Sequence, residues 1–248
     1  KSESAQVEVS DLWMDLVGNR PLRILSFFFI IAFTTMSISN AADSYFMTFN
    51  MHATPLMTTV FMWLGTIPAF IFMPMVPAIK RRIGKSGMFR LFLGIAIAAM
   101  LLMYLIMTVE SLKSISALIF LVQFVKSTGV VVATGYMWAL VPEVVTYSEY
   151  ASGHRVSGIV NALICIFMKA GMALGGVIPG LVLAWVGFKA GESVQTPMAE
   201  QGILWLVTLI PAVLFVLAIF VIGKYELSDE KIDELNAAVT NKTKKICN

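Results

Sequence analysis

The chain has 248 residues, of which 58% are hydrophobic and only 13% are charged. Its mean hydropathy is +0.83, whereas soluble domains carry about 25% charged residues. This composition excludes an ordinary soluble domain and predicts a membrane protein. The net charge of +3 is less informative than how the charges are distributed between the connections.

Six apolar stretches follow one another along the chain, each long enough to cross a hydrocarbon core of about 30 Å as an α-helix. We predict spans at about residues 22–48, 54–79, 88–109, 114–141, 157–186 and 203–223. The expected fold class is therefore all-α and integral to the membrane, with residues 21–223 forming a six-transmembrane-helix bundle.

The segments on either side of this bundle are polar. Residues 1–20 mix acidic and apolar side chains, which fits an amphipathic linker on the cytoplasmic membrane surface or a plain acidic linker. Residues 224–248 predict a cytoplasmic tail with one short helix, because Ser228 can cap a helix that has acidic residues in its first turn.

The distribution of Lys and Arg predicts the orientation of the bundle. All but four of the 18 Lys and Arg residues fall in connections expected on one side of the membrane. Lys113 and Lys189 fall on the other side, and Lys126 and Lys169 lie inside spans. Since Lys and Arg accumulate in cytoplasmic connections, we expect a multi-pass protein of a bacterial inner membrane with both termini in the cytoplasm.

Polar residues recur at helical spacing inside two spans. The first span carries Asn40 and Asp43, three residues apart, and the fourth carries Gln123 and Lys126 at the same spacing. Polar stripes of this kind are what a water-filled cavity between helices requires. We expect such a cavity here, with Asp43 paired to one of the intramembrane lysines. The alternatives are a buried ion pair that only fixes helix register, and an Asp43 that lies unpaired in an outer vestibule.

Lys169 lies in the fifth span, in an apolar run with no other charge between Arg155 and Lys189. A cation at the centre of a membrane helix costs roughly 2.5–3.5 kcal/mol on insertion scales. A chain tolerates that cost where the charge faces a partner or a wet cavity. Lys169 is therefore the first candidate for a residue on a transport path, with a purely structural ion pair as the alternative.

Two small-x-x-x-small repeats follow Lys169, Gly171 to Gly175 and Gly176 to Gly180. Small residues at this spacing let helix backbones approach closely. We expect ordinary packing within one bundle, with a dimer seam as the alternative.

No arrangement of residues typical of an enzyme is present in the sequence. The two histidines, His52 and His154, fall in connections on opposite sides of the membrane, and no phosphate loop or nucleophile elbow occurs. We therefore expect a protein that is not an enzyme and that binds no nucleic acid.

Several segments resemble the glycoside-pentoside-hexuronide:cation symporters, a family of the major facilitator superfamily related to melibiose permease. They are Gly18-Asn19-Arg20-Pro21-Leu22, Pro142-Glu143-Val-Val-Thr146-Tyr147-Ser148-Glu149, Gly153-His154-Arg155-Val-Ser-Gly158, Lys169-Ala-Gly171 and Lys224-Tyr225-Glu-Leu227. The family usually has Asp where Glu143 stands, a second acid where Thr146 stands and a glycine where Ser148 stands. Together these short segments are spread over nearly the whole chain, from residue 18 to residue 227.

The resemblance implies the C-terminal six-helix half of a twelve-helix transporter, whose N-terminal half would carry most of the cation-binding carboxylates. It places Lys169 beside the sugar and cation sites. It also implies a cytoplasmic gate at Glu143, Glu149 and Arg155, for which helix capping and surface anchoring are the plainer alternative.

The expected function is cation-coupled symport of a sugar or glycoside by alternating access. The expected partners are the substrate, a coupling cation (sodium or a proton), membrane lipid and the N-terminal half, with no further cofactor. The alternatives are a non-transporting membrane partner subunit and a lipid-handling transporter of the same fold. For the symporter, the residues expected at the substrate and cation-coupling site are Lys169, Lys126, Gln123, Asp43 and Asn40.

Overall fold

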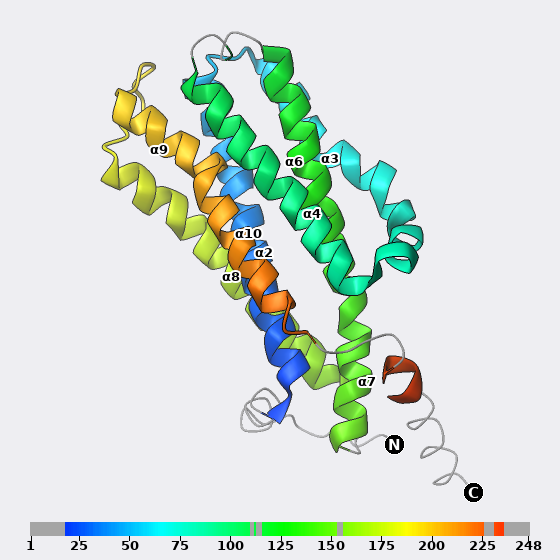
Figure 1. Cartoon of the computed structure of the whole chain (residues 1–248). Helices are drawn as coiled ribbons and strands as arrows, with labels where there is room; N and C mark the ends of the chain where they lie inside the picture. The colour runs from blue at the N-terminus through cyan, green and yellow to red at the C-terminus, as the bar shows by residue number, and fades with distance from the viewer. Residues whose placement is uncertain (1–17, 110–111, 113–115, 153–155, 226–230, 236–248) are drawn as a thin grey trace, which may run out of the picture.

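The computed structural model is an elongated bundle of helices that run side by side (Figure 1). It describes residues 18–109, 112, 116–152, 156–225 and 231–235. No strand occurs within these ranges, and the bundle begins and ends at the same end of the molecule. Residues 1–17 of the expected linker (1–20) and the cap at Ser228 lie outside the described residues, whereas residues 231–235 form a helical turn.

Helix α2, Arg20–Tyr45, lies where the first span is predicted. Its start is fixed by Asn19, whose side-chain oxygen accepts a hydrogen bond from the backbone N–H of Leu22, and by Pro21 in the first turn, where a missing N–H is harmless. A π-helical turn, Phe46–Asn50, continues α2 on the same axis.

The second and third predicted spans form one segment that folds back on itself. Helix α3, Pro55–Phe72, passes through a 3₁₀ turn, Met73–Met75, into α4, Val76–Thr108, in which Gly84 has φ 70°. The backbone is therefore helical through much of the expected connection, and the direction reverses around the left-handed glycine (Figure 1).

The fourth span extends further than the sequence indicates. Helix α6, Ser116–Met137, continues through a 3₁₀ turn, Trp138–Leu140, into α7, Val141–Ser152. The expected connection after residue 141 is thus helical. Pro142 does not stop it because it stands in the first turn of α7, where its N–H is not needed.

Helix α8, Ser157–Trp185, coincides with the fifth predicted span. The sixth is made of α9, Pro197–Val207, and α10, Leu209–Ile222. They meet at Thr208, which has φ −122° and ψ −74°. Pro211 accounts for the break, because it has no N–H to donate to the carbonyl four residues earlier.

The helices pack in the spatial order α8, α2, α10, α4, α6, α3, so α8 and α3 lie at the two ends of the series. Only Phe61 and Pro68 are buried in α3, and only 28% of the most apolar stretch of α8 is buried. These two helices therefore keep the most open surface.

Close packing of α8 on α2 depends on the first glycine repeat. A Cβ atom on Gly171 would lie 2.6 Å from the Ile30 carbonyl oxygen, and one on Gly175 would lie 2.5 Å from that of Thr34. The Thr34 hydroxyl also donates to the Gly171 carbonyl at 3.1 Å. The expected packing within one bundle is thus observed for this repeat, whereas Gly176 is exposed with nothing within 4 Å of such an atom.

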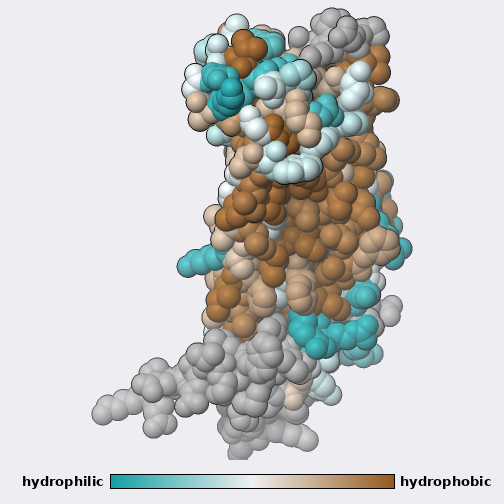
Figure 2. Space-filling model, turned by 90° about the vertical axis from the view of Figure 1, so that its left-hand side faces the viewer, coloured by the Kyte–Doolittle hydropathy of each residue, from teal (hydrophilic) through white to brown (hydrophobic). Residues whose placement is uncertain are grey.

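The described helices are long and apolar enough for a multi-pass membrane protein. Five helical segments meet that criterion, and the longest, Pro55–Thr108, has 54 residues. As one straight helix it would be about 80 Å long, but it folds back at Gly84 and so supplies two passes. Figure 2 shows a broad hydrophobic belt across the middle of one face, with hydrophilic residues above and below it.

Candidate functional site

A buried ion pair joins α2 to α6 inside the bundle. The Lys126 Nζ atom lies 3.3 Å from the Asp43 Oδ1 atom, and the Gln123 Nε2 atom donates to Asp43 Oδ2 at 3.2 Å. The three residues are 7% (Asp43), 1% (Gln123) and 3% (Lys126) exposed. The sequence led us to expect that Asp43 pairs with an intramembrane lysine, and the partner in the structure is Lys126.

Helix geometry explains why the three side chains converge. Gln123 and Lys126 lie one turn apart on the same face of α6, and Asp43 is in the last turn of α2 opposite them. Each carboxylate oxygen therefore receives its own donor. Both carboxylate oxygens of Asp43 are thus hydrogen-bonded, and the negative charge of Asp43 compensates the buried ammonium of Lys126.

The amide of Gln123 is only half satisfied. Its nitrogen is used by Asp43, while its oxygen is buried and accepts no hydrogen bond in the part of the chain that the structure describes. A buried acceptor without a donor costs about 1–3 kcal/mol. The side-chain oxygen of Gln123 is therefore available to accept a hydrogen bond from a hydroxyl or a water that enters the site.

The pair and Gln123 line a cavity of about 140 Å³ between α2, α3 and α6. Asn40, Thr66 and Ser127 add polar groups to its wall. Small-molecule pockets are usually about 300–1,000 Å³, so this cavity accommodates only part of a sugar-sized ligand. Asn40 thus joins the other predicted residues of the first and fourth spans at one site.

Lys169 does not belong to this cluster. Its side chain is exposed on α8, and no hydrogen bond or ion pair joins it to another described residue. Among the described acids, Asp43 is engaged by Lys126 instead. The two intramembrane lysines therefore differ, one being neutralised within the bundle and the other lying on its open face.

Of the three residues predicted for the cytoplasmic gate, the structure describes Glu143 and Glu149. Glu143 on α7 pairs with Lys85 at 2.7 Å between Oε1 and Nζ, and the Tyr225 hydroxyl donates to its Oε2 at 3.4 Å. Glu149 is half-buried and forms no ion pair with another described residue, and Arg155 lies outside the described residues.

The partners of Glu143 were not predicted from the sequence. Lys85 belongs to the basic run between the second and third spans, and Tyr225 belongs to the segment after the last span. Burial, and next the negative charge of Glu143, raise the pKa of Tyr225 far above its usual value. Tyr225 therefore stays protonated and donates to the carboxylate.

A second contact at the same end of the bundle joins α2 to α7. The Asn19 side-chain amide donates to the Ser148 hydroxyl at 2.5 Å, and both residues are buried. Together with the Glu143 cluster, it ties α7 to the first helix, to α4 and to the segment after α10.

A multi-pass helical bundle with charged and polar groups around an intramembrane cavity defines the class of membrane transporters. Residues 1–229 match the family described as MFS/sugar transport protein. The chain therefore belongs to this sugar-transporter family of the major facilitator superfamily.

Curated relatives match nearly the whole chain. It is 37% identical to a Bacillus subtilis protein named uncharacterized symporter YnaJ, over 98% of the chain and 51% of the relative. It is 30% identical to an Escherichia coli protein named glucuronide carrier protein homolog, over 97% and 51%. A Salmonella typhimurium relative, provisionally named a 2,3-dihydroxypropane-1-sulfonate exporter, is 29% identical over 88% and 45%.

The chain spans about half the length of the curated relatives it matches. This agrees with the size of one six-helix half of a major-facilitator-type fold. The relatives are named as symporters and carriers, which are transporters rather than enzymes.

Proposed function

We propose that this chain forms the C-terminal six-helix half of a secondary transporter that couples a cation to the uptake of a sugar or glycoside by alternating access. In this proposal it lies in a bacterial inner membrane, with its Lys- and Arg-rich end in the cytoplasm. The observation that carries the proposal is the cluster of Asp43, Gln123 and Lys126 on the wall of an intramembrane cavity.

The chemistry of the cluster fits a polyhydroxylated ligand. The ammonium of Lys126 has three donors, of which Asp43 uses one, and the amide oxygen of Gln123 is a free acceptor. Sugar hydroxyls both donate and accept. A sugar can therefore bond to both residues without breaking the ion pair, and the pair holds Lys126 in a fixed direction.

The small cavity implies that the rest of the ligand is bound elsewhere. In the proposed transporter the N-terminal half covers the open faces of α3 and α8 and completes the site. Lys169 would then face that half from α8. We propose that its ammonium compensates carboxylates of that half when the coupling cation, sodium or a proton, leaves.

Such compensation would couple the two ligands. When the cation occupies its site, Lys169 is released to donate to the substrate, and each ligand raises the affinity for the other. The intramembrane charge of Lys169 would thus be tolerated because it acts in one step of the cycle. No metal or cofactor beyond the coupling cation enters the proposal.

The test is accumulation of radiolabelled glycosides and glucuronides by the complete two-half transporter in proteoliposomes. Imposed sodium and proton gradients are compared with no gradient. We expect accumulation above equilibrium with one of the two gradients, and its loss in Lys126→Gln. Equilibration that ignores both gradients would exclude symport, and no flux at all would favour a non-transporting subunit.

Net export is a second candidate, because one relative at 29% identity bears an exporter's name. The cluster of Asp43, Gln123 and Lys126 would bind an exported substrate equally well, because the direction of net flux depends on the gradients and not on the binding site. Efflux of preloaded sulfonated polyols from inverted and right-side-out vesicles would distinguish it from glycoside uptake. A lipid-handling activity would instead show as movement of labelled lipid between leaflets.

A further inference from the structure

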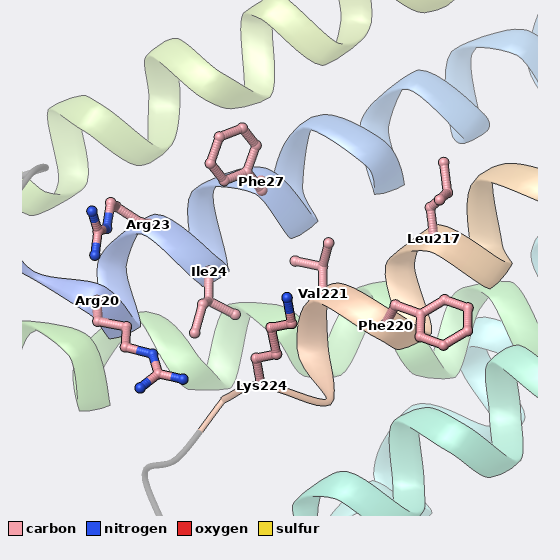
Figure 3. A pocket seen from close by; sticks show the side chains of 8 residues that line it. All are labelled: Arg20, Arg23, Ile24, Phe27, Leu217, Phe220, Val221 and Lys224. Atoms are coloured by element: carbon pink, nitrogen blue, oxygen red, sulfur yellow. The ribbon is translucent and has the colours of Figure 1, made fainter.

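A groove of about 420 Å³ runs between the start of α2 and the end of α10, at the Lys- and Arg-rich end of the bundle (Figure 3). We call it the α2–α10 groove. Arg20, Arg23 and Lys224 lie at its rim, and its apolar part includes Phe27, Leu217 and Phe220. It is separate from the cavity beside Asp43, which shares none of these residues.

The groove has a charged zone and an apolar zone, arranged along the membrane normal. Phe27 lies one turn beyond Arg23 in α2, about 6 Å deeper along the helix axis. In the antiparallel helix α10, Leu217 lies two turns before Lys224 and about 10 Å deeper along the helix axis. The cations of both helices thus lie at the same end of the bundle, with the apolar surface deeper in the groove.

No acidic residue among the described lining of the groove neutralises Arg23 or Lys224. None of the described residues that line it is acidic. The side chains of Arg23 and Lys224 are exposed and form no ion pair with another described residue, whereas Lys85 at the same end is engaged by Glu143. An anion is therefore the missing complement of Arg23 and Lys224.

The apolar zone identifies the kind of anion. Phe27 is 57% exposed, Phe220 is 67% exposed and Leu217 is 48% exposed. A free phosphate or a soluble metabolite would leave this surface bare, while an acyl chain covers it. Basic pockets between transmembrane helices at the cytoplasmic side are suited to phospholipid headgroups.

We infer that the α2–α10 groove binds one anionic phospholipid. Its phosphate lies between Arg23 and Lys224, and one acyl chain runs along Phe27, Leu217 and Phe220. The guanidinium of Arg23 can donate two parallel hydrogen bonds to the phosphate oxygens, and Lys224 adds a compact second charge. The inference does not depend on what the protein transports.

Native mass spectrometry of the purified complete transporter tests it directly. The protein is titrated with phosphatidylglycerol, or with phosphatidylcholine of the same acyl chains, and the fraction carrying one tightly retained lipid is measured. We expect preferential retention of phosphatidylglycerol. Arg23→Gln with Lys224→Gln should weaken it by roughly 25-fold, at about fivefold per charge removed near the membrane surface.

Three further variants distinguish specific lipid binding from misfolding and from non-specific electrostatic attraction. Arg82→Gln removes an exposed charge at the same end of the bundle but outside the groove, and it should leave retention unchanged. Arg23→Lys with Lys224→Arg keeps both charges and should retain most of the affinity. Leu217→Ser with Phe220→Ser should weaken retention while the charges remain.

Three outcomes would overturn the inference. Equal retention by the parent and the Arg23→Gln, Lys224→Gln variant would remove the phosphate site. Complete displacement of the lipid by excess inorganic phosphate would indicate a site for a soluble anion. Retention that appears only after deletion of residues 1–17 would mean that this acidic segment of the chain is the occupant.

Discussion

Removing one member of the Asp43–Lys126 pair separates its electrostatic contribution from its role in transport. At 3.3 Å and an effective dielectric constant of about 20, the attraction between unit charges is about 5 kcal/mol. Asp43→Asn deletes this attraction but leaves the ammonium of Lys126 buried. We therefore expect a loss of about 3–5 kcal/mol in the free energy of unfolding, the usual cost of orphaning a buried charge.

Removing both charges should behave differently. Asp43→Asn with Lys126→Met eliminates the desolvation cost together with the attraction, and such replacements are often neutral or stabilising. The double variant should therefore regain most of the lost stability. If the pair only fixes helix register, transport should return with it; if Lys126 donates to substrate, transport should stay lost.

The assay combines two measurements on the complete transporter. The apparent free energy of unfolding is followed in a denaturing-detergent titration, and accumulation is measured in proteoliposomes at equal protein content. Asn40→Ala serves as control for the stability measurement only, because Asn40 is exposed on the same helix and lines the same cavity without joining the pair. Unchanged stability of Asp43→Asn would refute the electrostatic reasoning, and full accumulation by the double variant would refute the substrate role.

Three further expectations follow from the arrangement of the helices. Lys169→Leu should insert and fold at normal abundance but lose cation-stimulated accumulation; full accumulation would leave Lys169 a purely structural charge. Gly171→Val should prevent normal folding because its side chain would meet the backbone of α2, whereas Gly176→Val should be tolerated, as thermal unfolding of both variants would show. A cysteine at position 111 should react with an impermeant label from outside intact cells, and one at position 84 should not; the reverse pattern would invert the proposed orientation.

The ion pair could be predicted from the sequence because a buried charge requires a partner. Asp43 is the only acid in the predicted spans, so composition suggested pairing with a lysine but left an unpaired Asp43 in an outer vestibule as the alternative. Which lysine it takes depends on which helices are neighbours. In the structure, α6 lies beside the end of α2, and α8 lies on the other side of α2. This order arises from packing between segments that are distant in the sequence, so no local sequence pattern predicts it.

Helix ends were predicted less well than helix centres. The basic run around Lys80 and Arg82 indicated a connection, yet the backbone stays helical there until Gly84. Similarly, α7 extends the fourth span to Ser152. Charge and polarity report where a chain leaves the membrane, whereas backbone hydrogen bonding decides where a helix ends, and the two boundaries need not coincide.

The contacts of Glu143 could not be predicted from the sequence for a different reason. Its resemblance to a family position indicated importance, but its partners come from residues 85 and 225, which no periodic pattern links to it. The cluster ties α7 to α4 and to the segment after α10. Glu143, which the sequence predicts to lie in a cytoplasmic connection, is therefore engaged inside its own bundle, and its part in any gate must act through those helices.

Each intramembrane lysine requires a counter-charge, but the two lysines differ in where that counter-charge comes from. Lys126 has its counter-charge within the chain and is 3% exposed, so its position is fixed by the fold of this bundle. Lys169 has no counter-charge among the described residues and lies on the open side of α8. A fixed charge is suited to orienting a ligand, while a charge compensated from outside the bundle can respond to a change at that outside partner. In the proposed transporter, substrate recognition by Lys126 would therefore survive a perturbation of the other half, and coupling through Lys169 would not.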